Sequence, residues 1–84
     1  MTIKEYREWD GTFTMAERAK AEEREQAMFD TLTETEIDEY FNLCSAHVYA
    51  FVDFGAKEEK RTAKALNDFC NAHNFTIKEA MIVY

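Results

Sequence analysis

The sequence predicts an all-α fold, a small bundle of three to four helices followed by a short C-terminal segment. Two observations predict it. The pattern Thr-x-x-Glu, in which a glutamate follows a threonine by three residues, occurs at five of the eight threonines and is the signature of a helix capping box. Apolar residues in the middle of the chain also recur at alternating spacings of four and three, as they do along one side of a helix.

The capping boxes predict where the helices begin. In each box the threonine hydroxyl accepts a hydrogen bond from the glutamate backbone, and the glutamate side chain accepts one from the threonine backbone. Helices are therefore expected to begin near residues 3, 15, 34 and 77, with two threonines competing for the third start. The five pairs are Thr2/Glu5, Thr14/Glu17, Thr31/Glu34, Thr33/Glu36 and Thr76/Glu79.

The first helix is predicted over residues 3–9 and ends before Gly11, because glycine favours the left-handed conformation that follows a helix. An alternative stays open here. Asp10-Gly11 is also a good sequence for a tight hairpin turn, with residues 12–15 as its second strand. That hairpin would make the fold α+β.

The second helix, residues 15–31, has high helix propensity but only a thin apolar stripe, so we expect it on the outside of the bundle. Its C-terminal end would be anchored by Met28, Phe29 and Leu32. The fourth helix, residues 56–73, has a predicted core face made of Ala63, Leu66, Phe69 and Cys70. Residues 77–84 fit a short helix or an edge strand, and eight residues do not decide between them.

The third helix, residues 34–54, is predicted to be the centre of the protein. Its apolar seam consists of Ile37, Phe41, Cys44, Val48 and Phe51. Its polar residues form a single strip, Asp38, Asn42, Ser45, Tyr49 and Asp53. A helix this apolar is expected to be wrapped by the other helices or shared with a second subunit.

Length and composition limit the class of protein. The 84 residues predict one domain, 1–84, with enough core to fold alone. No apolar run approaches the roughly 20 residues of a membrane span, so no membrane association is expected. Two cysteines and an N-terminus unlike a secretory signal predict free thiols and a cytoplasmic location.

The negative charge is concentrated in the middle of the chain. The 32 residues between Arg24 and Lys57 contain seven acids and no Lys or Arg, while the rest of the chain has ten acids and ten bases. The whole net charge of −7 therefore comes from this segment, called here the base-free segment. Such a chain is expected to be repelled by nucleic acid and to bind a basic protein surface.

The first functional hypothesis is a small acidic protein–protein interaction module. The residues predicted to bind the partner are Asp30, Glu34, Glu36, Asp38, Glu39, Tyr49 and Asp53. Carboxylates clustered on a rigid helix can imitate the charge of DNA, so the module would inhibit a nucleic-acid-handling enzyme by occupying its basic groove. In size and charge alone the chain is similar to small acidic phage proteins, anti-CRISPR inhibitors among them.

A second hypothesis is a homodimeric structural or assembly subunit, because residues 40–54 carry more apolar surface than one small bundle covers. A third, less favoured hypothesis is a zinc-stabilised domain. The two Cys-x-x-His turns would supply Cys44, His47, Cys70 and His73 to a tetrahedral zinc ion. A tight helical hairpin works against this, since it would separate the two histidines by roughly 13 Å along the helix axis. No other cofactor is predicted.

Catalysis is not predicted. A Cys–His nucleophile pair can be drawn from the same residues, but no oxyanion-donor loop accompanies it. Two glycines leave little room for a phosphate-binding loop, and no P-loop or dinucleotide motif is present. The acids from Asp30 to Glu39 also lack the glycine and the ligand spacing of an EF-hand.

Overall fold

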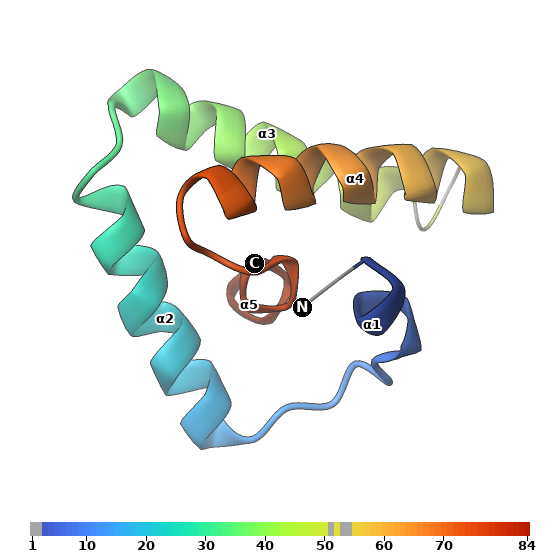
Figure 1. Cartoon of the computed structure of the whole chain (residues 1–84), viewed down its shortest axis with the longest axis horizontal. Coiled ribbons are helices and arrows are strands. Elements are labelled where there is room, and N and C mark those ends of the chain that lie inside the picture. Colours follow the sequence, from blue (N-terminus) through green and yellow to red (C-terminus); the bar gives the residue numbers. More distant parts are fainter. Residues whose placement is uncertain (1–2, 51, 53–54) are drawn as a thin grey trace.

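The computed structural model describes residues 3–50, 52 and 55–84, and these form five helices without a strand. The helices are α1 (Ile3–Glu8), α2 (Met15–Phe29), α3 (Glu34–Tyr49), α4 (Ala56–Ala72) and α5 (Ile77–Val83) (Figure 1). The predicted all-α class is confirmed, and the C-terminal segment is a helix rather than a strand. Within the described part of the chain, no helix has the length and apolar character needed to cross a membrane.

Three capping boxes hold the starts of α2, α3 and α5, as predicted. Thr14, Thr33 and Thr76 each accept a hydrogen bond from the backbone N–H of the glutamate three residues later, and the glutamate bonds back. Of the two threonines that compete for the start of α3, Thr33 is the cap. The Thr31 hydroxyl instead donates to the Met28 carbonyl at 2.8 Å. Thr2 lies outside the described residues.

The alternative hairpin at Asp10-Gly11 is wrong. The Asp10 carboxylate accepts hydrogen bonds from the backbone N–H and the hydroxyl of Thr12, at 2.9 and 2.6 Å, and these bonds hold its pKa below the ordinary value. Gly11 takes the left-handed conformation with φ of 81°. The segment after α1 is therefore a turn closed by an aspartate side chain, and no strand follows it among the described residues.

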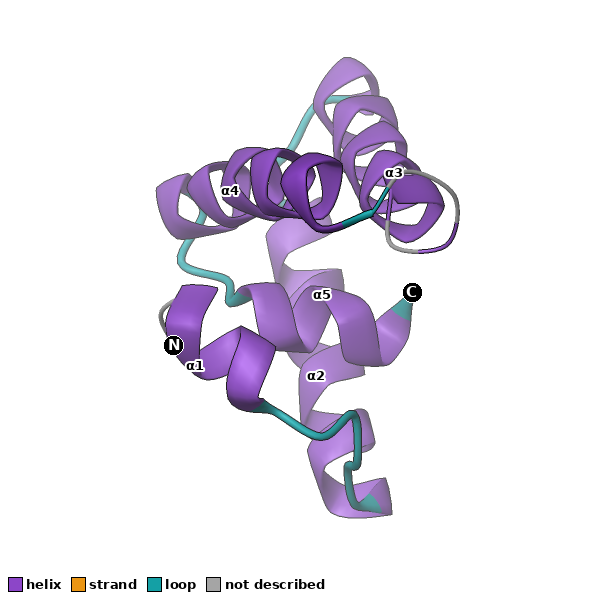
Figure 2. Cartoon of the chain, turned by 90° about the vertical axis from the view of Figure 1, so that its right-hand side faces the viewer, coloured by secondary structure: helices purple, strands orange, loops and turns teal. Residues whose placement is uncertain are grey.

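The helices surround α5. Figure 1 shows α3 and α4 side by side at the top of the molecule and α2 running down from the start of α3. α5, seen end-on, contacts α2 and α4, and α1 contacts α4 and α5. Figure 2, turned by 90°, shows α3 and α4 above the other three helices.

α3 and α4 run antiparallel, and two contacts fix their register. His47 Nδ1 lies 3.1 Å from Thr62 Oγ1, and Glu36 Oε2 lies 4.0 Å from His73 Nε2. Moving back 11 residues in α3 (47 to 36) thus corresponds to moving forward 11 residues in α4 (62 to 73). One end of the helix pair carries His47 and the other end carries His73.

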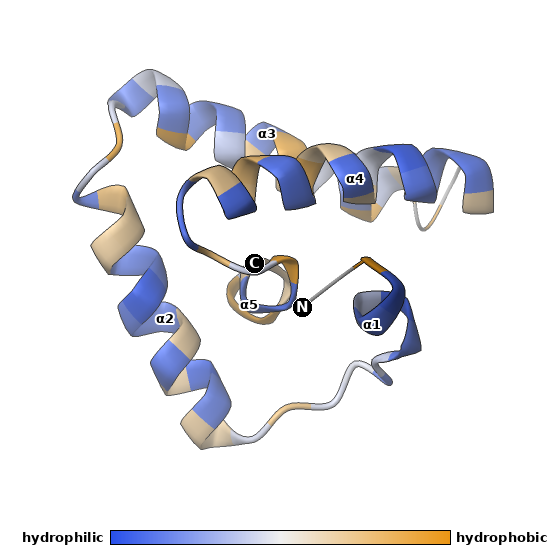
Figure 3. Ribbon diagram, viewed as in Figure 1, coloured by the Kyte–Doolittle hydropathy of each residue, from blue (hydrophilic) through white to orange (hydrophobic). Residues whose placement is uncertain are grey.

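The core lies where α3, α4 and α5 meet. Its largest fully buried side chains are Tyr40, Cys44, Leu66, Cys70 and Ile77. Met28 is buried against them, with Phe29 and Leu32 half-buried beside it, so the predicted anchoring of the end of α2 is confirmed. Figure 3 shows hydrophilic and hydrophobic residues alternating along α2 and α4, as expected for helices with one face toward solvent.

The predicted seam of α3 is wrong in part. The helix buries Tyr40, Cys44 and His47, whereas Phe41 and Val48 remain 42% and 40% exposed. Spacings of three and four residues fit either of two neighbouring stripes along the same helix. The stripe that is buried is the one whose polar side-chain atoms have hydrogen-bond partners. The Tyr40 hydroxyl donates to Glu25 at 2.7 Å, and both ring nitrogens of His47 are hydrogen-bonded.

The end of α3 also differs from the prediction. The α-helix ends at Tyr49 rather than at residue 54, and the Ala50 N–H bonds to the carbonyls of Ala46 and His47. Phe51, Asp53 and Phe54 lie outside the described residues, so the seam can be followed only to Val48 and the polar strip only to Tyr49.

Candidate protein-binding face on the third helix

No described acid of the base-free segment is paired with a Lys or Arg. Five pairs join a Lys or Arg to an acid within 4.0 Å among the described residues, and every one of these acids lies outside the segment. The pairs are Arg18–Glu22, Arg24–Glu79, Arg61–Glu58, Lys64–Asp68 and Lys78–Glu17. The charge asymmetry of the sequence therefore survives folding.

Three acids on α3 are exposed to solvent and have no such partner. Glu34, Asp38 and Glu39 are exposed, and no Lys or Arg of the described chain lies within ion-pair distance of them. Asp30, at the end of α2, is also exposed and accepts a hydrogen bond from the Gln26 side chain at 3.2 Å. These four predicted residues lie around the junction of α2 and α3.

Two other acids of the segment serve the fold. Glu36 accepts a hydrogen bond from the Thr33 backbone at 3.1 Å, and the two bonds it shares with Thr33 lower the pKa of its carboxyl. Glu25 is half-buried and accepts from Tyr40; burial raises its pKa, while the Tyr40 bond opposes that rise. Glu36 was also predicted to bind the partner; its carboxylate accepts a bond in the capping box and lies 4.0 Å from His73 Nε2.

One side of α3 collects much of the predicted polar strip. Glu34, Asp38, Asn42, Ser45 and Tyr49 follow one another at spacings of four, four, three and four residues, which places them on one side of a helix. All are exposed except Ser45, which is half-buried because its hydroxyl is hydrogen-bonded to the hydroxyl of Tyr84. We call these five residues the α3 face.

The remaining predicted residues lie away from the α3 face or cannot be placed. Glu39 and Glu36 lie further round the helix, and the contact of Glu36 with His73 shows that this is the side toward α4. Asp53 lies outside the described residues. Sequence reasoning missed the exposed apolar neighbours of the face, Phe41 and Val48, because it assigned them to the core; their spacing alone did not separate the two cases.

The structure does not bring the four predicted zinc ligands together. His47 and His73 lie at opposite ends of the α3–α4 pair, 11 residues apart in register, or roughly 16 Å at 1.5 Å per residue. The described residues contain no group of three or more His, Cys, Asp or Glu side chains that could hold a metal ion. Residues 56–60 are good helix formers and are the first residues of α4. The longer turn that would bring the two Cys-x-x-His turns to the same height therefore does not form.

The two cysteines are buried thiols of the core. Cys44 and Cys70 are fully inaccessible, and burial raises the pKa of each thiol to about 12. The thiolate is the reactive and metal-binding form of cysteine, and burial disfavours that form at both positions. Both act as small apolar residues between α3, α4 and α5.

His47 forms a buried hydrogen-bonded chain that was not predicted. The Thr62 hydroxyl donates to the Glu58 carbonyl at 2.9 Å, so its oxygen accepts from the Nδ1–H of His47 at 3.1 Å. The other ring nitrogen, Nε2, is then an acceptor for the Tyr6 hydroxyl at 2.9 Å. Burial lowers the pKa of His47, which agrees with a neutral ring that joins α1 to the α3–α4 pair.

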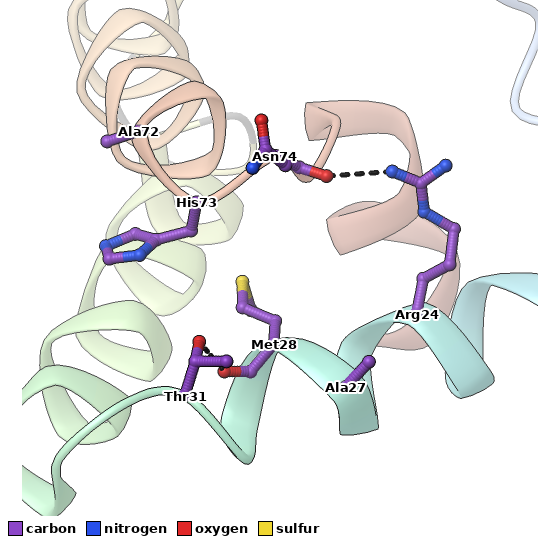
Figure 4. Close-up of a pocket in the computed structure, with 7 residues that line it drawn as sticks. All are labelled: Arg24, Ala27, Met28, Thr31, Ala72, His73 and Asn74. Carbon is purple, nitrogen blue, oxygen red and sulfur yellow. Dashed lines mark hydrogen bonds between the residues drawn. The ribbon is translucent and has the colours of Figure 1, made fainter.

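A hollow of about 440 Å³ lies between the ends of α2 and α4 (Figure 4). Arg24 and Met28 line it from α2, and His73 and Asn74 line it from the end of α4. The Arg24 guanidinium donates to the Asn74 carbonyl at 2.8 Å and lies 3.3 Å from the Glu79 carboxylate. Its charge is thus already paired within the fold, which makes the hollow a weak anion site.

Comparison with family models, with curated proteins and with solved structures gives no match for this chain. The function is therefore inferred from the α3 face and its charge.

Proposed function

We propose that the chain is a small protein-interaction module that binds a basic protein surface through the acidic end of the α3 face. The observation that carries the proposal is that Glu34 and Asp38 of this face, and Glu39 further round α3, are exposed and have no Lys or Arg partner among the described residues, which form five such pairs elsewhere. Its cysteines are free thiols, which suits action in a reducing compartment such as the cytoplasm.

A structural role at the helix start accounts for only part of this charge. Acids near a helix N-terminus are favoured by the helix dipole by about 0.3–1 kcal/mol each, and the effect falls off within the first turn. Glu34 and Glu36 lie in that turn. Asp38 and Glu39 lie in the next turn, so the dipole does not explain why no base lies beside them.

Inhibition of a nucleic-acid-handling enzyme is the form of this function that we favour. Glu34 and Asp38 are four residues apart, which separates them by about 6 Å along the helix. Every second phosphate of one DNA strand repeats at roughly 7 Å along the duplex axis. A basic groove that accepts phosphates can therefore accept these carboxylates, and direct binding to nucleic acid is not expected from a chain of net charge −7.

The proposal is tested by reversing charge at the acidic end. The double variant Glu34→Lys with Asp38→Lys is compared with Glu8→Lys with Glu23→Lys, which reverses two exposed acids outside the base-free segment. The probe is a labelled peptide of alternating Lys and Ser, measured by fluorescence anisotropy at low salt. We expect the first variant to weaken binding by about tenfold or more and the second, which has the same net charge, to weaken it much less. Equal weakening would mean that overall charge, and not the α3 face, binds the probe.

A homodimeric structural or assembly subunit is the second candidate, and the exposed apolar side chains Phe41 and Val48 favour it. Light scattering over a range of concentrations measures it directly. A chain that stays monomeric at high concentration eliminates the homodimer and leaves the interaction module unaffected.

A further inference from the structure

The exposed apolar side chains of the protein gather beside the α3 face. Of the seven large hydrophobic residues that are exposed in the described chain, Phe13 and Met15 lie before or at the start of α2. The other five lie on α3, just after it, or against it. They are Phe41, Val48, Tyr49, Val52 and Tyr84, which are 42%, 40%, 63%, 71% and 50% exposed.

Three of these side chains, Phe41, Val48 and Tyr84, lie beside the α3 face beyond its acids, and we count them from here on as its apolar part. Phe41 and Val48 are seven residues apart, so they lie on one side of the helix, next to Ser45. Tyr84 reaches the same place from the C-terminus, because its hydroxyl is hydrogen-bonded to that of Ser45. Figure 2 shows the C-terminal end of α5 below α3. The apolar part of the face is therefore built from α3 and the last residue of the chain.

Charge and apolar surface are separated along the helix. Glu34 and Asp38 occupy its first two turns, and the apolar side chains begin at Phe41 and continue past Tyr49. From Glu34 to Tyr49 the face is about 22 Å long. An amphipathic helix of similar length matches a straight strip of this kind.

We propose that the α3 face binds one amphipathic helix of a basic partner, with Lys or Arg over Glu34 and Asp38 and apolar side chains against Phe41, Val48 and Tyr84. The inference rests on the proposed function and names the kind of partner. Charge complementarity distinguishes this partner from a second copy of the chain. A second copy brings the same charge of −7 and the same unpaired acids, whereas a basic helix neutralises the acidic end and covers the apolar end.

The experiment uses two labelled peptides of equal length and equal charge. One is the Lys–Ser peptide described above. The other is a helix that carries its lysines in the turns at one end and leucines, at spacings of three and four, in the remaining turns. We expect the Lys–Leu helix to bind the whole chain about tenfold more tightly, because it also buries apolar surface. Its helix content, measured by circular dichroism, should rise on binding.

Two matched double variants locate the apolar contact. Val48→Asn with Val52→Asn removes Val48, one of the proposed contacts, together with the exposed Val52 just after α3, and Phe13→Asn with Met15→Asn changes the two exposed hydrophobic residues elsewhere. We expect the first pair to reduce binding of the Lys–Leu helix to the level of the Lys–Ser peptide. The second pair should change neither affinity, and thermal unfolding confirms that each variant is folded.

The outcomes separate the inference from the proposed function. If both peptides bind equally, or if Val48→Asn with Val52→Asn has no effect, the helix partner is wrong while binding of a basic surface stands. If neither peptide binds at low salt, both proposals fail. A concentration-dependent dimer that the same variant abolishes would show that a second copy covers this face, and that result overturns the inference.

Discussion

The two Cys-x-x-His turns of this chain have the same local sequence pattern and different structural roles. His47 lies in the interior of the α3–α4 pair, 2% exposed, with hydrogen bonds at both ring nitrogens. His73 follows the end of α4 with its side chain 24% exposed, and its Nε2 lies 4.0 Å from the Glu36 carboxylate. Both cysteines are fully buried. Two copies of a motif can therefore act together at one site only when the fold places them at the same height along the helix pair.

Removing the two histidines in turn should give the largest difference. His47→Ala leaves a buried gap and deprives Tyr6 and Thr62 of a partner, so we expect a loss of about 2–4 kcal/mol in the free energy of unfolding. His73→Ala removes a partly exposed side chain and should cost under about 1 kcal/mol. Urea denaturation of both variants measures the difference. Equal losses would mean that neither the packing nor the hydrogen bonds of His47 stabilise the fold more than the partly exposed His73 does.

Removing one hydrogen bond from His47 should have a smaller effect. Tyr6→Phe deletes the donor to Nε2 and keeps the ring, and we expect a loss of about 1 kcal/mol in the free energy of unfolding. The pKa of His47 should rise, because that bond favours the neutral ring. Tyr49→Phe is the control, since the Tyr49 ring is 63% exposed. Histidine NMR titration of the two variants reports the pKa, and an unchanged pKa in Tyr6→Phe would contradict the proposed direction of this bond.

The pH dependence of stability should also depend on His47. Burial lowers its pKa below the ordinary 6.5, with Glu59 of α4 acting against this shift and Arg7 of α1 adding to it. The unfolded chain therefore binds a proton more readily than the folded chain, so stability should decrease as the pH falls through 6.5 toward the lower folded pKa. Urea denaturation between neutral and mildly acidic pH tests this. The decrease should be smaller in His47→Ala, and an equal decrease would assign it to other groups.

Metal should have the smallest effect of all. Since the two histidines lie at opposite ends of the helix pair and both thiols have a pKa near 12, zinc should leave the melting temperature unchanged. Cobalt should give no thiolate charge-transfer band. Thiol titration should find both cysteines unreactive in the folded chain and reactive in urea. A cobalt band from the folded protein would show that the two turns can come together.

Local signals predicted most of the fold. Each box at Thr14, Thr33 and Thr76 joins residues three positions apart, so neighbours in the sequence are enough to specify it. The buried side of α3 was not predictable in the same way. Phe41 is the more apolar of two neighbouring aromatic residues, yet Tyr40 is the one that is buried, with its hydroxyl bonded to Glu25, 15 residues away.

The candidate face was predicted in part for the same reason. Glu34, Asp38 and Tyr49 share one side because of their spacing, which is a property of a single helix. That Glu36 also lies 4.0 Å from His73 depends on the packing of α4 against α3. That Tyr84 stands beside Ser45 depends on the path of α5, and no spacing in the sequence encodes it.

The sequence by itself determined the helices, their caps and the concentration of charge in the base-free segment, because each of these depends on residues close together in the chain. Only the tertiary structure decided which stripe of α3 is buried and that His47 and His73 lie far apart. It also decided that Glu34, Asp38 and Glu39 have no Lys or Arg partner among the described residues. These features depend on the register of α3 against α4 and on contacts between residues that are distant in the sequence. Such contacts must bury apolar surface and give the buried polar atoms hydrogen-bond partners at the same time.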